Sequence, residues 1–313
     1  MSYAMIFPGQ GSQSVGMMAA YGPHPVIRDT FEEASLVLGE DFWSLVSDGP
    51  EAELARTVVT QPLMLTAGIA VWRLWQARGL AQPDWLAGHS LGEYTALVAA
   101  GALGFTDALR LTRYRAEVMQ LAVPEGQGAM AAILGLDDAG VESACLSAAE
   151  GEVLEAANYN APGQVVIAGT RAAVERGMVA AKALGAKRTV MLPMSVPSHC
   201  SLMREAAGKL ATRLEDVAID TPRIPVLHNC DMITHSEPEA VRRALVEQLY
   251  SPVRWSGTLR TLADRGLVNI AECGPGKVLG ALCRRIDERL QGTALVDTES
   301  LDAFSQRMQE PRA

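Results

Sequence analysis

The sequence GHSLG at positions 88–92 matches the pattern G-x-S-x-G. In proteins with this pattern, a strained turn between a strand and a helix presents a serine hydroxyl at the edge of a sheet, where it can act as a nucleophile. The match is short, but residues 85–88 form an apolar, strand-like run and residues 93–102 have the character of a helix. Because the motif requires this context, we predict that Ser90 is a nucleophile rather than an ordinary turn serine.

A serine hydroxyl needs a base that takes its proton, and one of the five histidines is the expected partner. His24 and His235 lie in loop-like segments, and His228 ends an apolar run as a core histidine would. His89 lies on the strand-to-helix turn itself, which we call the elbow (residues 88–92). His199 follows the last strand expected before residue 197. At that point we expect the chain to return toward Ser90, to a cleft between the two parts of the protein. From spacing alone, a hydrogen-bonded structural histidine is an equally good interpretation of His199.

A serine nucleophile of this kind attacks an acyl carbonyl. The reaction therefore also needs N–H donors aimed at the oxyanion that develops in the transition state. In an elbow, one donor is the backbone N–H of the residue after the nucleophile, which is Leu91. The second normally comes from a loop after another strand, and Gln10 follows the strand expected at residues 3–7. A dinucleotide-binding loop is the alternative for this segment, but Ser14 replaces the third glycine of that motif.

The helix expected at residues 106–122 carries one charged residue on its apolar face. With about 3.6 residues per turn, Arg115 shares this face with Leu111 and Val118. Arg113 and Glu117 project from the opposite face. A buried guanidinium is costly unless an acceptor meets it. The residues alone leave two interpretations of Arg115 open: an internal carboxylate partner or an anionic substrate.

Strand and helix signals alternate along most of the chain, which indicates a parallel sheet with helices on both faces. Residues 126–197 show a different and shorter order of elements: strand, helix, two strands, helix and strand. This order is the ferredoxin-like pattern. We therefore expect an α/β core formed by residues 1–125 and 198–313, with residues 126–197 as an inserted ferredoxin-like α+β subdomain. A cleft between the two is the expected ligand site.

The composition disfavours several classes of function. Lys and Arg number 27 against 36 Asp and Glu, and the formal charge of -9 disfavours a general binder of nucleic acid or anionic membranes. No run reaches the roughly 18 apolar residues of a membrane span, and the first seven residues lack the features of a secretory signal. We therefore expect a cytoplasmic protein. Five cysteines without C-x-x-C spacing predict reduced thiols rather than disulfides or a metal site.

Six segments together have a more specific pattern than any one alone. They are FPGQGSQ at 7–13, TQP at 60–62, AGHSLGEY at 87–94, NYNAPGQ at 158–164, VPSH at 196–199 and ECGPGK at 272–277. In these segments the chain resembles the malonyl-CoA:acyl-carrier-protein transacylases of fatty-acid synthesis, over nearly its whole length. The resemblance implies an α/β-hydrolase-like core with the inserted subdomain, a catalytic pair of Ser90 and His199, and binding of the malonyl carboxylate by Arg115.

The resemblance also implies roles that spacing alone does not indicate. A main-chain carbonyl at Gln248 would orient the histidine in place of an acidic third member, and the family's oxyanion hole matches the two amides named above. Gln61 and Asn160 lie in the shared segments and are secondary candidates for the cleft. Ser251 stands where the family commonly has asparagine, which affects only the expected geometry of the loop near Gln248.

The reaction implied is a ping-pong transfer through a malonyl-serine intermediate. Malonyl-CoA would donate the malonyl group, and the phosphopantetheine thiol of acyl carrier protein would accept it, without a cofactor or metal ion. Three alternatives remain to be weighed: a serine thioesterase or esterase, the same transfer in polyketide synthesis or malonate decarboxylation, and a non-catalytic module that binds carrier protein. The last is disfavoured because the whole catalytic set is present.

Overall fold

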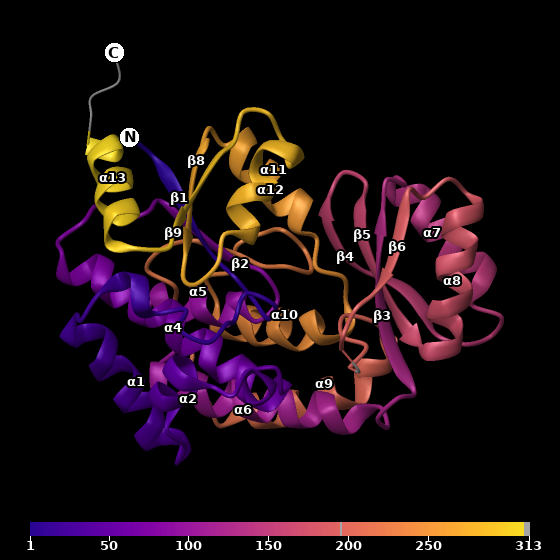
Figure 1. Ribbon diagram of the computed structural model, residues 1–313, viewed down its shortest axis with the longest axis horizontal. Coiled ribbons are helices and arrows are strands. Elements are labelled where there is room, and N and C mark those ends of the chain that lie inside the picture. The colour runs from indigo at the N-terminus through magenta and orange to yellow at the C-terminus, as the bar shows by residue number, and fades with distance from the viewer. Residues whose placement is uncertain (195, 310–313) are drawn as a thin grey trace.

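The computed structural model describes residues 1–194 and 196–309. The strands form two sheets, a parallel one with the order β7-β2-β1-β8-β9 and an antiparallel one with the order β4-β5-β3-β6. Figure 1 shows the antiparallel sheet, with helices α7 and α8, beside the larger body that contains the parallel sheet. The α/β class expected from the sequence, with a parallel sheet and a second, smaller sheet, is confirmed.

The central strands of the parallel sheet are buried on both faces. It consists of β1 (Tyr3–Phe7), β2 (Trp85–Gly88), β7 (Val226–Leu227), β8 (Asn269–Cys273) and β9 (Gln291–Leu295). In β1, Tyr3, Met5 and Phe7 pack into one hydrophobic core, whereas Ala4 and Ile6 pack into another. Successive side chains of a strand point to opposite faces, so a strand between two cores is apolar throughout. This explains why residues 3–7 form a continuous apolar run.

The register of the parallel strands brings two candidate loops together. Phe7, the last residue of β1, pairs with Gly88, the last residue of β2. Because neighbouring parallel strands end at the same edge, the loops that follow them share that edge, which is where ligands bind in such sheets. The loop with Gln10 and the turn with Ser90 therefore lie at one edge.

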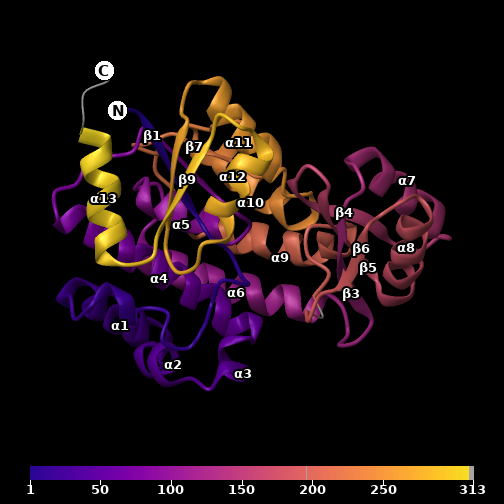
Figure 2. The same ribbon diagram turned by 45° about the horizontal axis from the view of Figure 1, so that its top comes forward.

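Helices cover both faces of the parallel sheet, as Figures 1 and 2 show. The larger core lies between one face and most of the helices, and the second core lies between the other face and α11 and α12. These helices are α1 (Pro25–Leu38), α2 (Phe42–Asp48), α3 (Glu51–Leu54), α4 (Thr57–Ala77), α5 (Gly92–Ala99), α6 (Phe105–Ala122), α9 (Arg204–Glu215), α10 (Pro238–Tyr250), α11 (Trp255–Asp264), α12 (Val278–Ile286) and α13 (Thr298–Gln309).

Helix α4 begins earlier than the sequence suggested. Apolar residues at helical spacing predict a helix over residues 62–77, but the helix begins at Thr57 and contains Pro62 in its interior. The additional residues contribute to the edge of the sheet described above. Thr57 donates a hydrogen bond to Gln10 Oε1 (3.0 Å), and Gln61 Nε2 donates to Thr57 Oγ1 (3.2 Å).

The antiparallel sheet has the ferredoxin-like order. Its unit consists of β3 (Gly128–Leu134), α7 (Asp138–Ala148), β4 (Leu154–Ala161), β5 (Gln164–Thr170), α8 (Arg171–Ala183) and β6 (Arg188–Met191). From the sequence we expect this strand near residues 153–157, but β4 continues to Ala161. Its second half binds the larger body, where Tyr159 N donates to Val253 O (2.9 Å). The domain boundaries at 126 and 197 stay a prediction. Among the described residues, no helix is long and apolar enough to cross a bilayer.

Candidate active site

The turn after β2 holds Ser90 in a left-handed conformation, with φ 51°. The turn is tight because glycines permit it: a Cβ on Gly88 would lie 1.9 Å from the backbone of Gly92, and one on Gly92 would lie 2.1 Å from Phe7 O. Asn229, in the loop after β7, binds the turn through its side chain. Its Oδ1 accepts from Ser90 N (2.7 Å) and its Nδ2 donates to Gly88 O (2.6 Å). Sequence reasoning did not identify Asn229.

His199 lies against Ser90. The His199 Nε2 to Ser90 Oγ distance is 2.7 Å, and the His199 Nδ1 to Gln248 O distance is 2.8 Å. Since a carbonyl can only accept, Nδ1 carries a proton and, in the neutral ring, Nε2 is free to accept the serine proton. Burial, and then the positive charge of Arg115, lower the pKa of His199 to about 3, while the hydrogen bond to Gln248 opposes this. The imidazole is therefore neutral at neutral pH.

Gln10 and Leu91, whose amides are expected to bind an oxyanion, both line the cavity that contains Ser90. A Cβ on Gly9 would lie 2.5 Å from His89 O and 3.7 Å from Leu91 N, so the loop after β1 packs directly on the elbow. Within the described part of the chain, neither Gln10 N nor Leu91 N donates to a protein acceptor. Both N–H groups can therefore donate to an oxygen that enters beside Ser90.

Arg115 is almost completely buried, with 1% of its surface exposed, and its charge faces the elbow. Its Nη1 donates to Gln61 Oε1 (2.7 Å), and its Nη2 donates to Gln248 Oε1 (2.9 Å) and lies 3.4 Å from Ser90 Oγ. Tyr94 packs its ring against the guanidinium. No carboxylate of the described residues forms an ion pair with this cation within 4.0 Å. Of the two interpretations, the internal carboxylate partner is thus not the one found.

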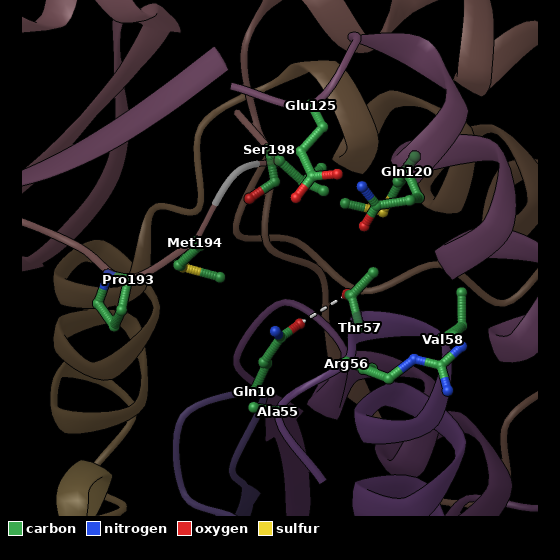
Figure 3. A pocket seen from close by; sticks show the side chains of 12 residues that line it. Gln10, Ala55, Arg56, Thr57, Val58, Gln120, Glu125, Pro193, Met194 and Ser198 are labelled. Atoms are coloured by element: carbon green, nitrogen blue, oxygen red, sulfur yellow. Dashed lines mark hydrogen bonds between the residues drawn. The ribbon is translucent and has the colours of Figure 1, made fainter. Parts of the chain in front are cut away.

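These groups line a cavity of about 180 Å³. Asn160, one of the secondary candidates, lies on its wall and contacts His89 Nε2 through Oδ1 (2.8 Å). A second cavity of about 470 Å³ shares four lining residues with the first and leads away between the start of α4, α6 and the loop after β6 (Figure 3). The shared residues are Gln10, Met119, Met194 and Ser198. A long, narrow substrate could therefore reach Ser90 through the larger cavity.

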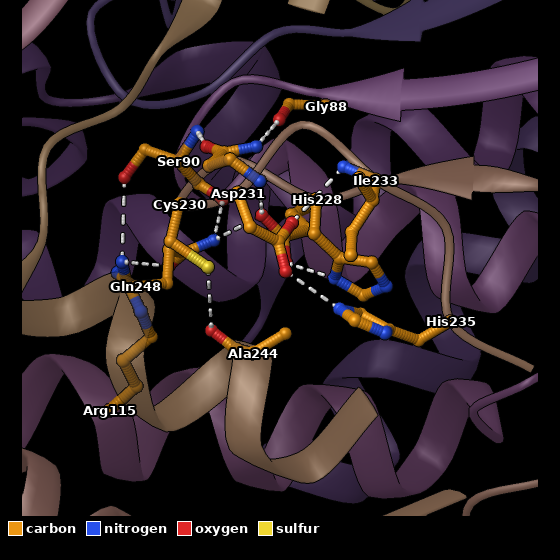
Figure 4. Close-up of polar contacts among 12 residues, drawn as sticks. Gly88, Ser90, Arg115, His228, Cys230, Asp231, Ile233, His235, Ala244 and Gln248 are labelled. Carbon is orange, nitrogen blue, oxygen red and sulfur yellow. Dashed lines mark hydrogen bonds and ion pairs between the residues drawn. The ribbon is translucent and has the colours of Figure 1, made fainter. Parts of the chain in front are cut away.

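A polar network under the elbow was not predicted from the sequence. Figure 4 shows part of it, including Gln248 and His228. Glu93 forms hydrogen bonds with the side chains of both residues. His228 is fully buried, as a core histidine would be, and its Nδ1 lies 2.7 Å from Glu93 Oε1. Glu93 belongs to the AGHSLGEY segment, which was the only sequence signal for its place beside the site.

The remaining polar candidates lie elsewhere. His24 precedes helix α1, and His235 pairs with Asp231 (2.7 Å). Four of the five cysteines are buried, the exception being Cys230, and all are free thiols. Among the described residues, no cluster of three histidine, cysteine or acidic side chains is placed to hold a metal ion.

Comparison with known proteins gives the family. The model of the acyl transferase domain matches residues 4–288. Malonyl CoA-acyl carrier protein transacylase of Escherichia coli strain K12 is 51% identical over 302 residues, which cover 96% of this chain and 98% of that protein. Its counterpart in Bacillus subtilis strain 168 is 42% identical over 309 residues, which cover 98% and 97%.

Solved structures agree with these relatives. An acyl carrier protein S-malonyltransferase from Vibrio cholerae has a TM-score of 0.95 and 50% identity, covering 97% of this chain and 100% of that one. A malonyl-transacylase in complex with its type II PKS acyl-carrier protein has a TM-score of 0.97 and 49% identity, covering 98% and 100%. The chain therefore belongs to the acyl transferase family, among the malonyl CoA-acyl carrier protein transacylases.

Proposed function

We propose that this enzyme transfers the malonyl group of malonyl-CoA to the thiol of an acyl carrier protein through a malonyl ester of Ser90. The observation that carries the proposal is the position of Arg115, a buried cation that lies 3.4 Å from the hydroxyl of Ser90 and pairs with no carboxylate of residues 1–194 and 196–309. An acyl group with a terminal carboxylate would supply the missing negative charge while its thioester carbon lies at the serine.

In the first half-reaction, His199 Nε2 takes the proton of Ser90, and Ser90 Oγ attacks the thioester carbonyl. The oxyanion accepts hydrogen bonds from the N–H groups of Gln10 and Leu91. When the tetrahedral intermediate collapses, its C–S bond breaks and the CoA sulfur receives the proton from His199. The product is malonyl-Ser90, and no redox cofactor or metal ion is needed because one ester bond replaces one thioester bond.

In the second half-reaction, the phosphopantetheine thiol of the carrier protein enters in place of CoA. His199 takes the thiol proton, the sulfur attacks the ester carbonyl, and Ser90 Oγ leaves with the proton from His199. The 470 Å³ cavity that joins the site is the route we propose for both pantetheine arms. The transfer would serve fatty-acid synthesis in the cytoplasm.

A labelling experiment tests the nucleophile. Enzyme incubated with malonyl-CoA that carries a radioactive malonyl group should retain one label per active site in the absence of carrier protein. Ser90→Ala should retain none, and turnover should fall by about a millionfold, as for other serine nucleophiles. Ser256→Ala, which removes another mostly buried serine, is the matched control and should be labelled like the wild type. A label that persists in Ser90→Ala would exclude Ser90.

A serine thioesterase shares this geometry and is the second candidate. It would release CoA continuously without carrier protein, because water would take the place of the carrier thiol. The transferase should instead release one equivalent of CoA per active site in a burst. Further release should then require carrier protein. Continuous, carrier-independent release at the rate of transfer would show that the protein is a hydrolase.

A further inference from the structure

The fully buried carboxylate of Glu93 has no part in the mechanism above, yet it contacts Asn229 and Gln248, which in turn contact Ser90, His199 and Arg115. We propose that Glu93 is a positioning residue for malonyl selectivity: it fixes the side-chain amide of Gln248, which in turn holds the guanidinium of Arg115. The inference rests on the proposed role of Arg115 as the group that binds the malonyl carboxylate.

Glu93 accepts hydrogen bonds from three donors, two on the loop after β7 and one on helix α10. Its Oε1 faces His228 Nδ1 at 2.7 Å. Its Oε2 accepts from Asn229 N at 3.0 Å and from Gln248 Nε2 at 2.9 Å. A carboxylate offers lone pairs on both oxygens, whereas an amide of the same shape offers only one oxygen. The three converging donors therefore call for a carboxylate at this position.

The orientation of the Gln248 amide follows from its partners. Its nitrogen donates to Glu93 Oε2 and to the main-chain carbonyl of Ser90, both at 2.9 Å. Its oxygen accepts from Arg115 Nη2, also at 2.9 Å. A guanidinium can only donate, and a carbonyl or carboxylate can only accept, so all three contacts agree on one orientation. A flipped amide would turn its N–H groups toward the cation.

Gln248 also orients the proposed base, His199. The main-chain carbonyl of Gln248 accepts from His199 Nδ1 at 2.8 Å, so one residue at the end of α10 bears on both the imidazole and the guanidinium. Glu93 also contacts the main chain of Asn229, whose side chain fastens the elbow. Its carboxylate is thus one residue away from Ser90, His199 and Arg115, and touches none of them.

Glu272 provides a matched control. It too is fully buried, and its carboxylate accepts from Leu279 N (3.2 Å) and Gly280 N (2.7 Å) at the start of α12. It does not line the cavity around Ser90. Replacing this carboxylate by an amide tests what the loss of a buried charge does to the fold, without a contact to Gln248.

The experiment compares Glu93→Gln, Glu272→Gln and Gln248→Met, alone and, for Glu93 and Gln248, together. The readout is the ratio of the rate constants of acyl-enzyme formation with malonyl-CoA and with acetyl-CoA, per active site counted by the burst of CoA. Loss of folded protein reduces the number of active sites for both substrates alike and leaves this ratio unchanged. We expect Glu93→Gln to lower the ratio about ten-fold or more, the scale of a hydrogen bond to a charged group. Glu272→Gln should not change it.

The double variant tests the route of the effect. If Glu93 acts through Gln248, then Glu93→Gln should change the ratio by less than about two-fold when Gln248 is already Met. An unchanged ratio in Glu93→Gln, or an equal loss in both backgrounds, would overturn the inference. Should Glu93→Gln not fold, Gln248→Met decides alone, and a wild-type ratio there would count against the inference. Failure of malonyl labelling in the wild type would instead contradict the proposed function.

Discussion

Ser90 and His199 lie 109 residues apart in the chain, and both have a left-handed backbone, with φ of 51° and 62°. Such angles are uncommon for residues other than glycine and persist only where the surroundings hold them. Asn229 Oδ1 holds Ser90 N at 2.7 Å, and Leu249 O holds His199 N at 2.9 Å. The 2.7 Å contact between hydroxyl and imidazole is therefore a product of two strained turns held by neighbouring segments.

The elbow should not tolerate a methyl group at Gly88. A Cβ there would lie 1.9 Å from the backbone of Gly92, which cannot move away like the end of a side chain. We expect Gly88→Ala to lower the free energy of unfolding in urea by about 3 kcal/mol or more and to abolish malonyl labelling. Gly208→Ala is the control: this exposed helical glycine has open space around it, so the change should stabilise the protein by about 0.5–1 kcal/mol. Equal effects of both changes would contradict the account.

Replacement of Arg115 by methionine should remove the preference for malonyl over acetyl groups. The guanidinium offers a charge and N–H donors to a carboxylate, and such bonds are worth about 1.5–3 kcal/mol, or roughly 10- to 150-fold in the ratio of kcat/KM values. Arg113→Met, on the outer side of the same helix, breaks a partly buried pair with Glu40 away from Ser90 and should leave the ratio unchanged. If discrimination survives in Arg115→Met, another group recognises the carboxylate.

The sequence predicts much of this fold because the elements have strong local signals. The apolar runs at β1 and β2 and the glycines of the turn between β2 and α5 are continuous features that local patterning can detect. Strand β7 has only two residues, Val226–Leu227, and β9 begins with exposed residues, so neither has a clear apolar pattern. The prediction starts α4 at Pro62 instead of Thr57 because it follows the expected helix only where its apolar spacing is clear.

The candidate site was predictable only where a residue belongs to a motif or breaks a pattern. Ser90 lies in its elbow, and Arg115 is a charge within an apolar stripe. Asn229 carries no such signal, since its contacts with the elbow depend on the packing of β7 beside β2. The side chain of Gln248 is similar: the resemblance implied its carbonyl, but its amide contacts arise only when α10 lies beneath the elbow.

The activity of the Ser90–His199 pair should persist at an acidic pH where an ordinary histidine would be protonated. Burial first, and the charge of Arg115 second, lower the pKa of His199 to about 3, and only the neutral imidazole can take the serine proton. The rate at which an uncharged sulfonyl fluoride inactivates Ser90 reports on this pair without malonyl-CoA. We expect that rate to decline well below pH 6.5, the usual pKa of histidine.

Removal of the positive charge should shift this decline in a known direction. A neighbouring cation disfavours the imidazolium, so Arg115→Met should raise the pKa of His199 and move the loss of inactivation to higher pH. Arg113→Met should not shift it. A malonyl carboxylate bound to Arg115 would neutralise the same charge, so the substrate itself would make His199 a stronger base. A decline at the same pH in Arg115→Met and the wild type would show that the guanidinium and the imidazole are electrostatically independent.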